Sequence, residues 1–164
     1  MSTPSPRLIL SLSGLACAAA VVGALISQHH FDMLPCPWCI LQRMIFMLLA
    51  VWLLAAAALP WSGLRRVMAG LAVLLAGSGV AAALYQHFVA AKLNSCALTL
   101  ADRIITATGL DLRWPDVFEV KASCADAAVS LMGVPYEFWA LALFALVGVL
   151  ALVSALARPG HARS

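Results

Sequence analysis

The sequence predicts an all-α integral membrane protein, built as a bundle of four transmembrane helices with two extracytoplasmic loops. Of the 164 residues, 64% are hydrophobic and only 10% are charged, whereas charged residues make up about 25% of a typical soluble domain. Four apolar segments are long enough to cross a bilayer, which takes roughly 20 helical residues. They are residues 8–27, 40–59, 67–91 and 138–157. We therefore expect residues 1–164 to form a single membrane domain.

The first apolar segment has a second interpretation as a cleavable signal peptide, because Arg7 precedes it and small residues fill it. Its apolar stretch is longer than the roughly 7–15 residues of a usual signal core. No A-x-A cleavage pattern closes it before the polar residue Gln28. A transmembrane helix is the better interpretation.

The distribution of basic residues predicts the orientation in the membrane, since short cytoplasmic loops are rich in Lys and Arg. Arg7 precedes the first span, Arg65 and Arg66 lie in the short turn between the second and third, and Arg158 and Arg163 follow the fourth. The long segment 92–137 also holds four basic residues, but they are diluted over its length and offset by six acidic ones. Both termini and the turn between the second and third spans are therefore expected in the cytoplasm. Residues 28–39 and 92–137 then form the two periplasmic loops. The ten basic residues are scattered rather than gathered into a stripe, so nucleic acid is not an expected partner.

The five cysteines divide between the membrane and the outside loops. Cys17 lies in the middle of the first span, where a cysteine behaves as a small hydrophobic packing residue. The other four lie in the outside loops: Cys36, Cys39, Cys96 and Cys124. In an oxidising compartment such as the bacterial periplasm, four such cysteines indicate two potential disulfides.

A C-x-x-C pair opens the second span. We expect Cys36 to cap this helix, with Pro37 at the first helical position and Cys39 in the first turn. Unpaired N–H groups and the helix dipole favour a thiolate there. The same pattern is compatible with half of a zinc site or with a structural disulfide, but its place at a helix start on the membrane surface favours a redox-active pair.

Arg43 lies four residues after Cys39, on the same helix face and one turn deeper in the span. An ionisable residue inside a membrane is a candidate functional residue. The alternative is a guanidinium that reaches up to the headgroups and anchors the helix. The neighbouring thiol favours a functional role, because the same charge can stabilise a thiolate and hold a carbonyl oxygen.

The long second loop is expected to carry short amphipathic helices. Apolar residues recur with helical spacing over residues 94–110, and Gly109 ends the pattern. This helix is expected on the membrane surface, on top of the bundle, or both. The segment from Ser123 to Asp126 resembles a capping box, which predicts a second short helix that ends near Gly133.

Taken together, these motifs resemble the bacterial DsbB family, whose members are inner-membrane proteins of disulfide bond formation. The shared features are four spans, C-x-x-C at the outer start of the second, Arg43 after it, and Tyr85, Gln86 and His87 at the outer end of the third. A cysteine pair in the second outside loop and residues 133–139 entering the fourth span complete the match. The resemblance implies a protein-dithiol:quinone oxidoreductase. It would reoxidise a periplasmic DsbA-type thiol oxidase and pass the electrons to ubiquinone or menaquinone.

The resemblance also implies roles for single residues. The implied disulfides are Cys36–Cys39 and Cys96–Cys124. Cys96 is expected to form the mixed disulfide with the partner, and Cys124 to exchange with Cys36. Cys39 is expected to contact the quinone, with Arg43 and His87 as further quinone-binding residues. Gln42 stands where an acidic residue also occurs in the family, so no acid at this position is essential here.

Two rival functions are compatible with the residues. One is a specialised paralogue that serves a single dedicated partner. The other is a zinc-binding membrane protein with four thiolate ligands and with His29 and His30 as spare ligands. The helix-start position of the C-x-x-C pair favours the redox function over the zinc site.

Overall fold

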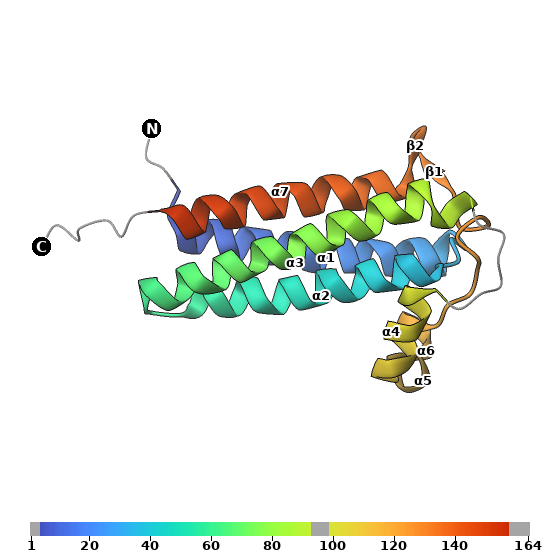
Figure 1. The fold of residues 1–164 in the computed structure, drawn as a ribbon, viewed down its shortest axis with the longest axis horizontal. Helices are drawn as coiled ribbons and strands as arrows, with labels where there is room; N and C mark the ends of the chain where they lie inside the picture. Colours follow the sequence, from blue (N-terminus) through green and yellow to red (C-terminus); the bar gives the residue numbers. More distant parts are fainter. Residues whose placement is uncertain (1–3, 93–98, 158–164) are drawn as a thin grey trace, which may run out of the picture.

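The four expected transmembrane helices are present in a computed structural model, which describes residues 4–92 and 99–157. They are α1 (Pro6–His30), α2 (Pro37–Ala58), α3 (Ser62–Phe88) and α7 (Tyr136–Leu156). Each is long and apolar enough to cross a membrane. The four helices run side by side along the long axis of the molecule (Figure 1). The predicted fold class, a four-helix membrane bundle, is confirmed.

The long loop between α3 and α7 folds into a small cap at one end of the bundle. After the 3-10 turn η1 (Ala90–Lys92), it contains α4 (Leu100–Thr108), α5 (Leu110–Arg113) and α6 (Pro115–Phe118). These three short helices lie beside the first turns of α2, where α4 packs against it (Figure 1). The loop then forms a hairpin of β1 (Ser130–Leu131) and β2 (Val134–Pro135) before it enters α7.

Helix α4 confirms the amphipathic helix expected in the second loop. It ends at Gly109, whose φ of 62° is the left-handed conformation that suits glycine at a helix end. Its start at Leu100 is set by a capping box between Thr99 and Asp102. Ala101 and Ile105 are buried while Leu100 is exposed, so the apolar face packs on the bundle. The first residues of the expected helix lie outside the described residues.

The prediction of a second helix near Ser123 is wrong. Ser123 and Asp126 do pair, with the Asp126 backbone N–H donating to the Ser123 hydroxyl at 3.2 Å, but only a single turn follows. The chain then reverses through Met132 and Gly133, whose φ values of 55° and 79° suit a two-residue hairpin. Hydrogen bonds of the hairpin replace those of a helix that would be too short to propagate.

Small residues let the long helices approach closely, as is usual where lipid provides no hydrophobic driving force between helices. A Cβ atom on Gly79 of α3 would overlap the ring of Phe144 in α7. That ring stacks on Phe46 of α2, with 3.8 Å between the ring centroids. The absent side chain at position 79 therefore permits an aromatic pair that joins three helices. Cys17 is fully buried in the same core, as expected for a packing residue.

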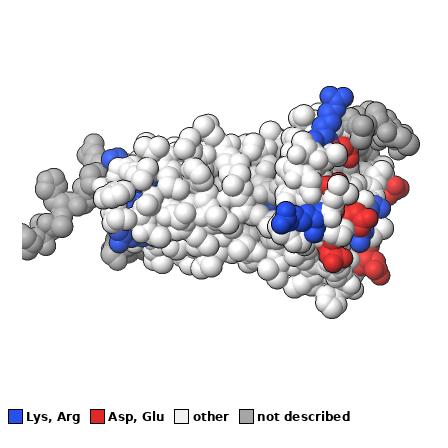
Figure 2. Space-filling view, turned by 90° about the horizontal axis from the view of Figure 1, so that it is seen from below, with Lys and Arg blue, Asp and Glu red and all other residues white. Residues whose placement is uncertain are grey.

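The charged residues gather at the two ends of the bundle, and on the face in Figure 2 the acidic ones lie at the cap end. At the opposite end, arginines satisfy carbonyl groups where helices finish. Arg7 and Arg65 donate to the Leu59 carbonyl at 3.3 and 3.0 Å, and Arg66 donates to the Ala155 carbonyl at 3.0 Å. The two ends of the bundle thus differ chemically, as an orientation in a membrane requires.

Replacing Gly79 by alanine should destabilise the bundle, because the added methyl group displaces the Phe144 ring from Phe46. Overpacking of this kind costs about 1–3 kcal/mol. Thermal unfolding in detergent should show a lower midpoint for Gly79→Ala. Gly77→Ala is the matched control, since a Cβ on exposed Gly77 meets no atom within 4 Å. Equal midpoints for the two variants would contradict the account.

Candidate functional site

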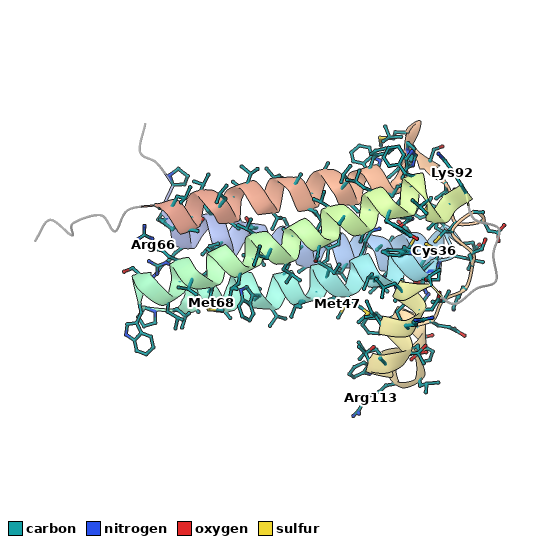
Figure 3. The ribbon with its side chains drawn as sticks, in the orientation of Figure 1. Cys36, Met47, Arg66, Met68, Lys92 and Arg113 are labelled. Atoms are coloured by element: carbon teal, nitrogen blue, oxygen red, sulfur yellow. The ribbon has the colours of Figure 1, made fainter. Side chains whose placement is uncertain are left out.

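The start of α2 places the first two sulfur atoms of the site. Cys36 is the N-cap, and its sulfur accepts a hydrogen bond from the Cys39 backbone N–H at 3.3 Å. Pro37 occupies the first helical turn, where a missing N–H has no consequence. The Cys36 and Cys39 sulfurs lie 2.9 Å apart, at the cap end of the bundle (Figure 3). The cap and first-turn positions expected for this pair are confirmed.

The second loop brings a third sulfur to the same place. The Pro35 carbonyl accepts backbone hydrogen bonds from Lys121 at 3.0 Å and from Ala122 at 3.3 Å. These bonds dock the loop against the start of α2, so that Cys124 packs in one buried cluster with Cys36. Cys96 lies outside the described residues. The disulfides Cys36–Cys39 and Cys96–Cys124 stay predictions.

The thiols of Cys36 and Cys124 have opposite protonation preferences. The hydrogen bond shared with Cys124, the one shared with Cys39, and burial all raise the pKa of Cys36. The same interaction with Cys36 lowers the pKa of Cys124, and the Trp38 backbone N–H lowers it further. Cys36 is therefore the protonated sulfur in the middle, and Cys124 has the character of a thiolate, the nucleophilic form.

Arg43 is buried inside the bundle rather than extended to the headgroups, with 5% of its surface exposed. Its Nη1 donates to the Gln28 side-chain oxygen of α1 at 2.9 Å and to the Val117 carbonyl of α6. The Gln28 amide in turn donates to the Asp116 carbonyl at 3.0 Å. The Nε of Arg43 is buried and has no hydrogen-bond partner among the described residues. Arg43 is therefore not a snorkelling anchor in this structure, and its functional role stays a prediction.

A cavity of about 620 Å³ lies next to these groups. Its wall includes Cys39 and Arg43 of α2. Apolar residues of α1 and the Trp139 ring of α7 form much of the rest. A partly open cavity of this size with a mainly apolar wall and some polar groups is typical of a site for a small organic molecule. The unpartnered Arg43 Nε fits a ligand that carries a carbonyl oxygen, as a quinone does.

His87, the other expected quinone-binding residue, is not on the wall of this cavity. Its Nδ1 lies 2.7 Å from the carboxylate of Glu137 at the start of α7. Glu137 is buried and does line the cavity. The structure therefore connects His87 to the cavity through Glu137, and the expected contact with quinone stays a prediction.

Four polar residues of this region were missed by the sequence reasoning as site residues: Gln28, Gln42, Gln86 and Glu137. All four are buried. The sequence did contain a sign of their role. Each is a polar residue in or next to an apolar span, where burial costs free energy unless the side chain has a hydrogen-bond partner. What the sequence did not contain was which of them face one another. Within residues 4–92 and 99–157, no group of three or more His, Cys, Asp or Glu side chains is placed to hold a metal ion.

Comparisons with known proteins relate this chain to one family. The family described as "Disulfide bond formation protein DsbB" matches residues 6–154. The chain is 34% identical over 145 residues to "Disulfide bond formation protein B 1" of Pseudomonas putida, which covers 88% of this chain and 86% of the relative. It is 32% identical over 166 residues to "Disulfide bond formation protein B" of Burkholderia thailandensis, which covers 99% and 97%. No solved structure matched significantly.

Replacing Cys36 by alanine should slow the alkylation of Cys124 in the reduced protein. The variant removes the hydrogen bond that lowers the pKa of Cys124, so less thiolate is present at about pH 7. We expect a several-fold lower rate with iodoacetamide, followed by mass spectrometry of the Cys124 peptide. Cys39→Ala is the control and should not slow the reaction, because charge on Cys39 raises the pKa of Cys124. Faster alkylation in Cys36→Ala would show that access, not protonation, controls this thiol.

Proposed function

This chain belongs to the DsbB family of membrane proteins that form disulfide bonds, and we propose that it is a protein-dithiol:quinone oxidoreductase. In this proposal it reoxidises a DsbA-type thiol oxidase and passes the electrons to a membrane quinone. One observation carries the proposal. Cys36 lies between Cys124 and Cys39. Cys39 and Arg43 both line the cavity, so the cysteines that would exchange disulfides lie next to a candidate ligand site.

The proposed orientation places the cysteine cluster in the periplasm and both termini in the cytoplasm of a bacterial inner membrane. Its support is the group of arginines at the opposite end, since Arg7, Arg65 and Arg66 mark the cytoplasmic side by the positive-inside rule. Cys96 then lies in a periplasmic loop. We assign Cys96 the mixed disulfide with the partner, whose attack on the Cys96–Cys124 bond releases Cys124 as a thiolate.

The released Cys124 is well placed for the next exchange. It attacks the Cys36 sulfur of the Cys36–Cys39 disulfide, so a Cys124–Cys36 bond forms and Cys39 leaves as a thiolate. The lowered pKa of Cys124 supplies the attacking thiolate. The N-terminus of α2 favours negative charge on the departing sulfur. Two electrons have now reached Cys39, the only one of the three cysteines that lines the cavity.

The cavity offers the groups that a quinone site needs. Arg43 donates to a carbonyl oxygen, and the Trp139 and Phe46 rings provide flat apolar walls. A bound quinone accepts two electrons and two protons and so draws the cysteines back to the disulfide state. This drive is necessary, since a DsbA-type oxidant has a potential of about −120 mV and ordinary disulfides cannot reoxidise it.

Arg43→Met tests the proposal, because it keeps the apolar stem and removes the charge and the donors beside Cys39. The KM for quinone should rise about tenfold or more, as expected for the loss of a charge-assisted hydrogen bond. Arg43→Lys should recover only part of the loss, since an ammonium lacks the planar fork.

The control is the exchange step without quinone. Pre-oxidised Arg43→Met protein should still oxidise an equimolar amount of reduced DsbA-type partner through its Cys96–Cys124 bond, because that step does not release Cys39 as a thiolate. If quinone kinetics are unchanged in Arg43→Met, the residue serves only to hold the loop, and the quinone site lies elsewhere.

A further inference from the structure

Two buried glutamines form a hydrogen-bonded chain that ends on the Cys39 sulfur, and the exchange scheme above gives them no role. Gln86, near the end of α3, is 4% exposed, and Gln42 of α2 is 5% exposed. The Gln86 amide nitrogen lies 3.3 Å from the Cys39 sulfur. The Gln42 amide nitrogen donates to the Gln86 side-chain oxygen at 2.6 Å. The result is a chain of two amides that ends on the sulfur facing the cavity.

Burying two amides inside a membrane protein costs free energy unless the amides form hydrogen bonds. An amide withdrawn from water without hydrogen bonds costs several kcal/mol in an apolar environment. Here the oxygen of Gln86 is held by Gln42, which leaves an N–H of Gln86 directed at Cys39. A thiolate accepts such a hydrogen bond strongly, because the acceptor is charged.

Neutral amides suit this sulfur in both of its protonation states. With Gln42 as the donor to Gln86, the sulfur receives an N–H, which matches a thiolate. If both amides turn over together, the oxygen of Gln86 faces the sulfur instead and can accept from a thiol. A carboxylate at position 86 offers only acceptors and repels the thiolate, so glutamine supports a step in which Cys39 leaves as an anion.

We propose that Gln86 is a catalytic residue, whose amide N–H stabilises the Cys39 thiolate, and that Gln42 is the positioning residue that fixes the orientation of this amide. The inference deepens the proposed function, on which it rests for the direction of the exchange. Arg43 acts on the same sulfur by charge, whereas Gln86 acts by direct contact. The two effects can therefore be separated by substitution.

The test uses full-length protein in detergent in which Cys39 is the one remaining cysteine. The rate of its alkylation by iodoacetamide is measured at about pH 7 and at about pH 10, where a thiol is largely ionised. Gln86→Met has the same length without a donor and should lower the ratio of the two rates about tenfold. Gln86→Glu should lower it further, and Gln42→Met should lower it about threefold by freeing the Gln86 amide.

Ser78→Ala is the matched control on α3, since Ser78 is exposed and its hydroxyl donates only to the Leu75 carbonyl; its ratio should equal that of the parent. If the glutamines only pack, their variants change access and shift both rates together, and an unchanged ratio in Gln86→Met and Gln86→Glu overturns the proposal. The assay contains neither quinone nor partner. A lowered ratio therefore supports the role of Gln86 even where quinone reduction is absent, a result that would count against the proposed function alone.

Discussion

Burial of the Arg43 guanidinium is the constraint on which the cap end of this bundle depends. A charged group inside a membrane protein must be surrounded by hydrogen-bond acceptors, because lipid offers none. Here the acceptors come from two other parts of the chain, the Gln28 side chain of α1 and the Val117 carbonyl of α6. Satisfying one cation thus fixes α1, α2 and the cap to one another. The cavity beside Cys39 exists because these three parts are held in register.

The docking of the cap on α2 also explains why the sulfurs of Cys36, Cys39 and Cys124 lie together. The cap is held at α6 by Arg43 and Gln28, and a few residues later at Lys121 by the Pro35 carbonyl. Cys124 follows immediately and reaches the sulfur that caps α2. The start of α2 therefore holds these sulfurs in place and also favours negative charge on them, because of its N–H groups and its dipole.

The sequence predicted the parts of this protein whose physical signal is local. The length of the apolar segments predicted the four helices. Cys36 followed by Pro37 predicted the start of α2, and Gly109 predicted the end of α4. The failures involve contacts between distant segments. Where a helix was expected after Ser123, the chain forms a hairpin in which the Tyr136 N–H donates to the Val129 carbonyl at 3.0 Å. The partners of Gln28 and Gln86 depend on how the helices pack. Buried polar residues in apolar spans signalled that partners exist, but only the structure identifies them.

If electrons pass from the Cys36–Cys39 pair directly to a quinone, this pair should reduce a quinone without the help of the loop cysteines. Protein with Cys96 and Cys124 replaced by alanine is reduced fully, freed of reductant and mixed anaerobically with a soluble quinone. Absorbance follows the quinone while mass spectrometry follows the loss of two hydrogens from the protein. One quinol should form for each Cys36–Cys39 disulfide, and no reaction should occur when Cys39 is also alanine. Quinone reduction without this disulfide, or a dithiol that stays reduced beside excess quinone, would contradict it.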